Sequence, residues 1–405
     1  YEYNKDGNIC KITSPGNVIR TFGYDDYGRR ILINDPQAGT RHISYNEEGK
    51  NAKEEVMGDP SKSVNYQYDT YGHVMSKQYD NCNLIYQYDK YGKILKEYKD
   101  DNTSSKVYYY DDLQRLLKTV QTCEDGTSLT IEYTYSEGNI ASNTYTTSKG
   151  LHAKVDYSYR NGILSKATLN GNKVIWELIA EDNQGKATEY GTLSLRNKYN
   201  YDGNGLLSTI STFNGNSLKF QENYIFDAPT GNLMYRSNHH GVKENFEYDS
   251  LDRLIKINNQ TIVYDEEGNI KENSAVGEFE YSSEMPYSVT KVRPLTNKIP
   301  SWDQAITYNA LSKPFTIEER DYKCDFSYST DDERSKMNIT KDGIIEKTKY
   351  YFGSTYELIK TSTGYTERLY LIGDAYTAPV VLVSNNGKQQ LYSITRDYLN
   401  SIKAI

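Results

Sequence analysis

The sequence predicts an all-β protein, built from tandem β-hairpins that join into one long, curved and spiralling sheet. Three observations support this fold class. A unit of about 20 residues recurs along the chain, as in YQYDTYG at 66–72 and YQYDKYG at 86–92. Within the units, apolar and polar residues alternate with the period of a half-buried strand. An Asp-x-x-Gly string then marks a turn between two such strands.

The unit at 64–74 shows how each part forms. Val64, Tyr66 and Tyr68 alternate with polar residues and are good strand formers. An Asp at position 69 can begin a turn, because its carboxylate accepts the N–H two residues later. Three positions further on, a Gly at 72 can adopt the positive φ that returns the chain to a strand through a bulge.

The same turn is spread over most of the chain. The units chosen as structural turn sites contain the Tyr, the Asp and the closing Gly together: Tyr24, Asp25 and Gly28; Tyr68, Asp69 and Gly72; Tyr88, Asp89 and Gly92; Tyr201, Asp202 and Gly205; Tyr264, Asp265 and Gly268. In the copies at 66–75 and 86–95, a basic residue and two apolar residues follow the Gly. The gap of 42 residues between Tyr159 and Tyr201 is expected to hold a degenerate copy. We therefore assign residues 1–348 to one hairpin array.

Two segments differ from the regular array. Residues 286–302 include Pro286, Pro294 and Pro300, and proline cannot donate to a strand ladder. We expect this segment to be a loop that leaves the sheet. Residues 349–405 are richer in aliphatic side chains and form a separate C-terminal region.

The composition fits a thin sheet and excludes some partners. The chain has 41 tyrosines among 405 residues, and a Tyr ring can be buried while its hydroxyl faces water. A net charge of −8 and a pI near 5.4 speak against a nucleic-acid partner. The sequence has no apolar run near the ~18 residues of a membrane span.

The Tyr-Asp repeats with a closing Gly resemble the YD repeats of RHS (rearrangement hotspot) proteins. Similar repeats occur in teneurins and in the shell-forming components of insecticidal toxin complexes. The C-terminal string also resembles an Asp-His-Leu-Gly-Ser-Ile-Arg signature of the RHS core. Asp397, Leu399, Ser401 and Ile402 match this signature, while Tyr398, Asn400 and Lys403 replace His, Gly and Arg. On this resemblance, residues 349–405 are a truncated C-terminal region of the RHS core.

The resemblance implies a partial or complete hollow shell that encloses a polypeptide cargo. The implied cargo is the protein's own C-terminal domain, outside this chain, acting as the toxin of a polymorphic toxin system. It also implies a bacterial protein that is secreted or displayed at the cell surface, and we expect a monomer. Self-cleavage in the family depends on an aspartate motif downstream of the signature, so that activity is not transferred to this chain.

The sequence shows no constellation that points to catalysis, to a cofactor or to a bound metal. It lacks the H-E-x-x-H, G-x-S-x-G, phosphate-loop and dinucleotide motifs. Paired carboxylates such as Asp25-Asp26 lie in hairpin turns, where the repeat already explains them. The alternative to a shell is an extracellular adhesion module whose tyrosine faces bind carbohydrate or a cell-surface partner. An enzyme ranks third.

Overall fold

The computed structural model describes residues 1–80, 82–101, 103–295 and 302–405. These residues form strands and turns, with no α-helix among them and one short 3-10 turn at Pro15–Asn17. The strands belong to three sheets, of 28, nine and two strands. The predicted all-β class with tandem hairpins is confirmed.

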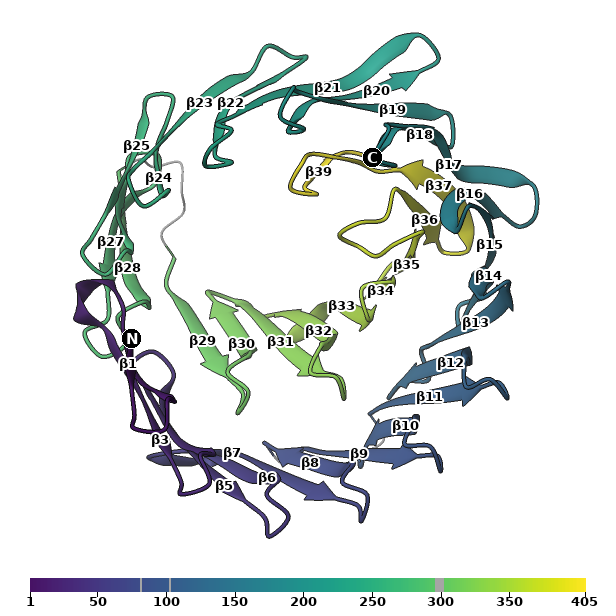
Figure 1. The fold of residues 1–405 in the computed structure, drawn as a ribbon. Helices are drawn as coiled ribbons and strands as arrows, with labels where there is room; N and C mark the ends of the chain where they lie inside the picture. The colour runs from purple at the N-terminus through teal and green to yellow at the C-terminus, as the bar shows by residue number, and fades with distance from the viewer. Residues whose placement is uncertain (81, 102, 296–301) are drawn as a thin grey trace. The chain divides into compact units, whose positions relative to one another are not determined.

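The first part of the large sheet follows the chain order in Figure 1. Its strands are β1 Glu2–Tyr3, β2 Ile9–Thr13, β3 Ile19–Tyr24, β4 Arg30–Asp35, β5 Gly39–Tyr45, β6 Asn51–Val56, β7 Asp59–Tyr68, β8 Val74–Tyr79, β9 Cys82–Tyr88, β10 Ile94–Lys99, β11 Ser104–Tyr110, β12 Leu116–Cys123, β13 Ser128–Ser136 and β14 Asn139–Thr147.

The large sheet continues with β15 His152–Arg160, β16 Ile163–Leu169, β17 Lys173–Glu181, β18 Ala187–Thr192, β19 Leu195–Tyr201, β20 Leu207–Asn214, β21 Ser217–Phe226, β22 Leu233–Asn238, β23 Lys243–Tyr248, β24 Leu254–Ile257, β25 Gln260–Tyr264, β26 Ile270–Asn273, β27 Gly277–Tyr281 and β28 Val289–Pro294.

The second sheet has nine strands, and a short hairpin follows it. The nine strands are β29 Gln304–Tyr308, β30 Pro314–Glu319, β31 Tyr322–Tyr328, β32 Arg334–Lys341, β33 Ile344–Phe352, β34 Tyr356–Thr361, β35 Gly364–Leu371, β36 Val380–Asn385 and β37 Lys388–Ser393. The final hairpin pairs β38 Thr395–Arg396 with β39 Ile402–Ala404.

Strands that are neighbours in the chain pair in an antiparallel manner, as β11–β12, β20–β21 and β35–β36 do. In the regular hairpins the register shifts at the turn Tyr. In β7–β8, for example, Gln67 lies opposite Ser76, but Tyr68 lies opposite Val74. The return strand therefore holds one extra residue, which is the bulge expected after the turn Gly.

The prediction of a loop at 286–302 is wrong over part of this segment. Residues Val289–Pro294 form strand β28, which pairs with β27 from Val289 opposite Tyr281 to Pro294 opposite Gly277. Pro294 is tolerated because it is the last residue of the strand, where a missing N–H interrupts no further pairing. Pro286 lies in the turn before β28, and Pro300 lies outside the described residues.

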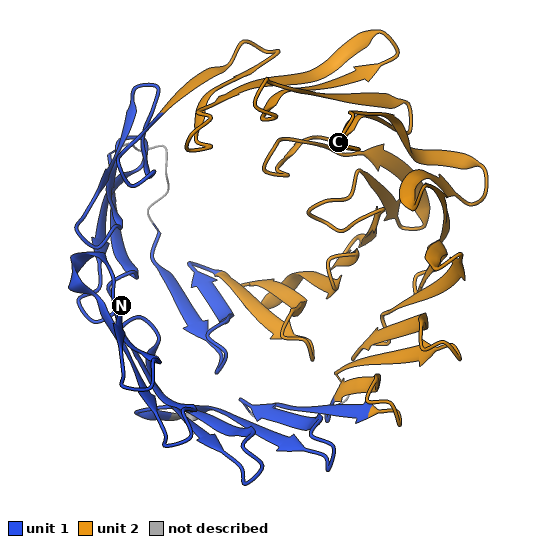
Figure 2. Cartoon of the chain, in the orientation of Figure 1, with its two compact units in different colours: residues 1–87, 99–101, 247–321 blue, residues 88–98, 102–246, 322–405 orange. Residues whose placement is uncertain are grey.

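Two compact units make up the chain, coloured separately in Figure 2. Unit 1 contains residues 1–87, 99–101 and 247–321. Its buried cluster joins Val64, Tyr79 and Leu84 of the first hairpins to Ala310, and the Ala310 N–H donates to Asp80 Oδ2 over 2.7 Å. This small core thus joins strands of the large sheet to the turn between β29 and β30 of the nine-stranded sheet.

Unit 2 contains residues 88–98, 102–246 and 322–405. Its main core packs side chains of β12–β17 against those of β33–β36, including the fully buried Leu151, Val155, Tyr356 and Leu369. The predicted boundary between residues 348 and 349 falls inside β33, so it does not coincide with a break in this sheet. The boundary at 348/349 marks only a change in the sequence pattern.

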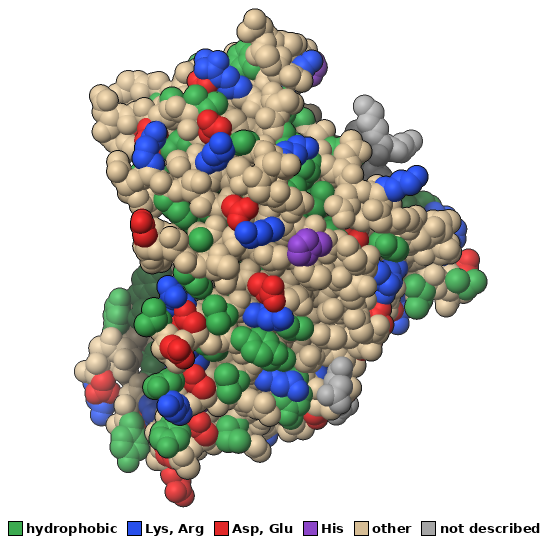
Figure 3. Space-filling model, turned by 90° about the vertical axis from the view of Figure 1, so that its right-hand side faces the viewer, with side chains coloured by type: hydrophobic (Ala, Val, Ile, Leu, Met, Phe, Trp, Pro, Cys, Tyr) green, Lys and Arg blue, Asp and Glu red, His purple; other side chains and the backbone are tan. Residues whose placement is uncertain are grey.

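Charged side chains of opposite sign are interspersed on the face shown in Figure 3. Cross-strand ion pairs of unit 2, such as Lys118–Glu132 at 3.0 Å, follow the same mixed pattern. Such pairs contribute little to stability when exposed, but they keep strand faces soluble. No helix of the described residues combines the length and the apolar character needed to cross a bilayer.

Candidate functional site

The predicted turn residues lie in hairpin turns of one geometry. In the turn after β3, Asp25 Oδ1 accepts the N–H groups of Tyr27 at 3.0 Å and Arg29 at 2.8 Å. The N–H of Gly28 donates to the Asp25 carbonyl, and Gly28 has a φ of 76°. Only the absence of a β-carbon makes this φ easy, which is why Gly closes the turn.

The other turns predicted from the sequence repeat this pattern. Side-chain oxygens of the turn aspartates accept backbone N–H groups two and four residues later at Asp69, Asp89 and Asp202, and four residues later at Asp265. The closing glycines have φ values of 92° at Gly72, 80° at Gly92, 78° at Gly205 and 88° at Gly268.

The turn tyrosines connect one repeat to the preceding one. The hydroxyl of Tyr24 donates to the carbonyl of Ile9 at 2.8 Å, and that of Tyr68 donates to the carbonyl of Asn51, also at 2.8 Å. Tyr264 donates in the same way to Leu254 at 2.9 Å. Each acceptor carbonyl belongs to the residue that opens the return strand of the repeat before. The ring therefore packs on the sheet while its hydroxyl satisfies a backbone group.

The basic residue that follows the turn in several repeats has a second role. Arg29 pairs with Asp25 of its own turn at 2.7 Å, and its guanidinium lies 4.5 Å from the ring centre of Tyr45 in the next repeat. Arg115 makes the same two contacts with Asp111 and Tyr135. Sequence reasoning noticed this basic position but missed its function, which is to join a turn carboxylate to the following tyrosine ring.

The degenerate copy expected after Tyr159 has a turn at Asp182–Gly185. Asp182 Oδ1 accepts the N–H groups of Gln184 and Lys186, and Gly185 has a φ of 79°. Glu181 stands where other copies have Tyr, which is why a search for Tyr-Asp missed it. Lys186 still lies over the next turn tyrosine, with its ammonium 3.6 Å from the Tyr201 ring centre.

The C-terminal signature is itself a copy of the repeat turn. Asp397 Oδ1 accepts the N–H of Leu399 at 3.0 Å and that of Ser401 at 2.9 Å. Asn400 occupies the Gly position with a φ of 64°, a conformation that Asn tolerates better than most residues. Ile402 then opens the return strand β39. The Asn at this position therefore closes the turn as Gly does in the regular repeats.

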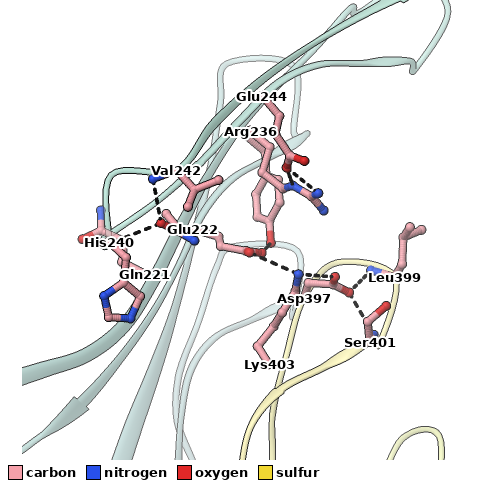
Figure 4. Close-up of polar contacts among 12 residues, drawn as sticks. Gln221, Glu222, Arg236, His240, Val242, Glu244, Asp397, Leu399, Ser401 and Lys403 are labelled. Atoms are coloured by element: carbon pink, nitrogen blue, oxygen red, sulfur yellow. Dashed lines mark hydrogen bonds and ion pairs between the residues drawn. The ribbon is translucent and has the colours of Figure 1, made fainter. Parts of the chain in front are cut away.

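The signature turn is fixed to β21 by a buried ion cluster, drawn in Figure 4. Lys403 Nζ lies 3.2 Å from Asp397 Oδ2 and 3.3 Å from Glu222 Oε1. The side chains of Asp397 and Glu222 are only 2% and 5% exposed, against 26% for Lys403. Two carboxylates that are removed from water thus share one ammonium, and its positive charge compensates the burial of both.

Aromatic rings surround the same cluster. Tyr398 packs edge-on against Tyr224 and Phe226, with ring centres 5.1 and 5.4 Å apart. The Tyr224 hydroxyl donates to Glu222. Burial and the neighbouring Glu222 carboxylate raise the pKa of Tyr224, so its hydroxyl stays protonated. Arg236, on β22, donates to Glu244 at 2.7 Å beside a pocket of about 210 Å³ that Glu222 and Lys403 also line.

This cluster is suited to holding a segment in place. Its carboxylates are already engaged with Lys403, with backbone N–H groups and with a tyrosine hydroxyl. Over the part of the chain that the structure describes, no three or more His, Cys, Asp and Glu side chains are placed to hold a metal ion. The arrangement thus docks the signature turn onto the large sheet within unit 2.

Comparison with known proteins gives a family match over the N-terminal part of the chain and a shared fold over most of it. Residues 1–186 match the family model described as Teneurin YD-shell. Comparison with curated protein sequences gave no match. The resemblance to YD-repeat proteins is confirmed by this family match and by the solved structures.

Several solved structures share the fold over almost the whole chain. The crystal structure of TcdB2–TccC3–Cdc42 has a TM-score of 0.75 at 14% identity, over 95% of this chain and 24% of that chain. TcdB2–TccC3 without its hypervariable C-terminal region gives a TM-score of 0.74 at 15% identity. The match covers 95% of this chain and 24% of that chain. The Tc holotoxin pore of Photorhabdus luminescens, with a mutated TccC3, gives a TM-score of 0.66 at 14% identity. The match covers 95% of this chain and 23% of that chain. This chain therefore spans about a quarter of the length of these proteins.

Proposed function

We propose, from the YD-shell family match over residues 1–186 and the fold shared with the TcdB2–TccC3 structures, that this chain is a structural part of a shell that encloses and shields a polypeptide cargo. The cargo is a toxin domain of the same natural protein, and the assembly is secreted or displayed on a cell surface. The chain performs no catalysis of its own.

The observation that carries this proposal is how the repeats use their polar groups. Turn carboxylates bind the backbone of their own turn, and turn hydroxyls bind the carbonyls of the preceding repeat, as Asp25 and Tyr24 show. The residues that recur most regularly are thus used to extend the sheet. A wall made in this way excludes proteases by its continuity and needs no reactive group.

The docked signature turn supports the same role. The Lys403 cluster holds residues 395–404 on β21, so this hairpin is attached to the large sheet within unit 2. The two carboxylates that flank Lys403 are buried, so this attachment is specific as well as polar.

The test uses the natural protein that contains this chain. Each domain without Tyr-Asp repeats is digested with a protease while attached and again after being expressed alone. We expect the cargo domain to be cut much more slowly when attached. Equal rates of cleavage for the attached and the free domain would contradict enclosure.

A surface-binding role is the second candidate, and exposed turn tyrosines favour it. Tyr27 and Tyr71 of unit 1 are 85% and 86% exposed at the tips of their turns. Exposed aromatic rings of this kind can stack on sugars or on a partner surface. Replacing both by Ala should abolish retention on a glycan array if this role holds, and should leave protection of the cargo unchanged if the shell role holds.

A further inference from the structure

A pocket of about 370 Å³ lies between β18–β20 and the C-terminal segment of unit 2. This volume lies in the range of ordinary small-ligand pockets, roughly 300–1,000 Å³. Side chains of the sheet and of the signature region line it together, among them Tyr190, Tyr199, Tyr201, Ile210, Arg396 and Tyr398. Asp397, which pairs with Lys403, also lines this pocket.

Two stacked tyrosines contribute aromatic surface to the pocket wall. The rings of Tyr190 and Tyr199 lie 5.6 Å apart at an angle of 24°, and their hydroxyl oxygens are 2.9 Å apart. Burial raises the pKa of both hydroxyls, so both remain protonated donors at neutral pH. One hydroxyl hydrogen joins the two oxygens. The hydrogen of the other hydroxyl has no acceptor within hydrogen-bond distance among the described residues.

Arg396 adds further donors and a positive charge. Its guanidinium donates to the carbonyls of Ala375 at 2.9 Å, Asn400 at 2.8 Å and Ala378 at 3.4 Å. These bonds use three of its five N–H groups. No carboxylate of the described residues is within ion-pair distance of it, and the neighbouring Asp397 is engaged with Lys403. Burial lowers the pKa of Arg396, because its charge is partly removed from water.

The pocket therefore offers unused donors, a cation with no carboxylate of the described residues within ion-pair distance, and aromatic surface from the tyrosine pair. A carboxylate would accept from the guanidinium and balance its charge, since Arg binds carboxylates in a planar, bidentate manner. A ring attached to that carboxylate would stack on the tyrosines. We propose that this pocket binds a small ligand in which a carboxylate is joined to an aromatic or a pyranose ring, with the ring packed against the tyrosine pair and the carboxylate on Arg396. This binding site goes beyond the proposed shell function and does not depend on it.

Tryptophan fluorescence can detect this binding. Trp176 lies 6.2 Å from the ring of Tyr190, and the chain has two tryptophans in all. The full chain with Trp302→Phe would therefore keep Trp176, next to Tyr190, as its single tryptophan reporter. Benzoate and glucuronate are titrated as an aromatic acid and a sugar acid, with benzamide and glucose as their neutral counterparts. We expect a saturable change with at least one acid, and the acid that binds more tightly identifies the source of the ligand.

Substitutions then separate the pocket from its surroundings. Losing one charge-assisted hydrogen bond should weaken binding by about tenfold or more in Arg396→Gln. Arg368→Gln is the matched control, because Arg368 is 44% exposed and lies 3.6 Å from Glu357 elsewhere in unit 2. Since Arg396→Gln also removes contacts to three carbonyls, Tyr199→Phe provides a second variant, which keeps the ring and should bind several-fold more weakly.

Three results would overturn the proposal. The first is the absence of a saturable response to either acid. The second is a response to benzamide or glucose as strong as that to the corresponding acid. The third is unchanged acid binding in Arg396→Gln and Tyr199→Phe, with both variants folded by circular dichroism.

Discussion

Replacing Lys403 by Met should release the C-terminal signature from the sheet. The substitution keeps the length and much of the apolar volume of the side chain but removes the ammonium. That ammonium lies 3.2 Å from Asp397 and 3.3 Å from Glu222, whose side chains are 2% and 5% exposed. Two buried carboxylates would then face each other without a shared cation.

The expected magnitude follows from the burial of the cluster. Removing one partner of a buried ion pair costs about 3–5 kcal/mol. Lys403 is itself 26% exposed, so the lower end of that range applies, about 3 kcal/mol. The final hairpin has only two strand residues in β38 and three in β39, so undocking is an easier response than unfolding of the sheet. About 3 kcal/mol corresponds to roughly a hundredfold rise in the undocked population.

Amide hydrogen exchange is the assay, because it reports local opening. In Lys403→Met, the amides of residues 395–404 should exchange roughly a hundredfold faster, while those of β21 should change little. Lys388→Met is the control, because Lys388 is exposed on β37. Adding Glu222→Gln to Lys403→Met should restore part of the protection, since it removes one of the two unbalanced charges. Exchange at parental rates in Lys403→Met would refute the reasoning.

Three further predictions concern the repeats and the packing of unit 2. Gly205→Ala should lower the free energy of unfolding by about 1–2 kcal/mol, because Gly205 has a φ of 78°. Tyr135→Phe should lower it by about 1 kcal/mol through loss of the hydrogen bond to the Leu116 carbonyl, 2.8 Å away. Burial raises the pKa of Asp125, but hydrogen bonds from Lys360 and Thr127 outweigh it and hold that pKa well below its usual range. Its contribution to stability is therefore present above the unfolded pKa of about 3.9 and is lost as the pH falls below it.

Each of these predictions has a matched control. Urea unfolding measures the first two. Gly203→Ala, in the same turn but without a positive φ, should be neutral or slightly stabilising, and equal losses at the two glycines would contradict the turn geometry. Tyr91→Phe alters a 63% exposed tyrosine and should cost little, so a similar loss there would remove the argument for Tyr135. For Asp125, unfolding midpoints are measured from pH 7 to pH 3, and Asp125→Asn should flatten the acid limb of that curve.

The sequence by itself determined the local unit and the fold class. Alternating apolar residues and Asp-x-x-Gly turns act over a few neighbouring positions, so the hairpin around Tyr68, Asp69 and Gly72 could be predicted from its own residues. Asp397, Leu399, Ser401 and Ile402 were singled out by resemblance alone, and it is the structure that places Asp397 and Ser401 in one turn. Sequence reasoning failed at Val289–Pro294, because a proline at the end of a strand looks the same in sequence as a proline in a loop.

Only the tertiary structure decided which distant side chains meet. Lys403 and Glu222 are 181 positions apart, and no local pattern links an ammonium to a carboxylate at that separation. The contact depends on how β39 is placed against β21, which follows from the packing of the whole of unit 2. The same is true of the pocket between Tyr190 and Arg396, whose walls come from separate sheets. Short-range hydrogen bonds can be predicted from residue spacing. The burial that strengthens the interactions of a charge or a hydroxyl depends on the complete fold.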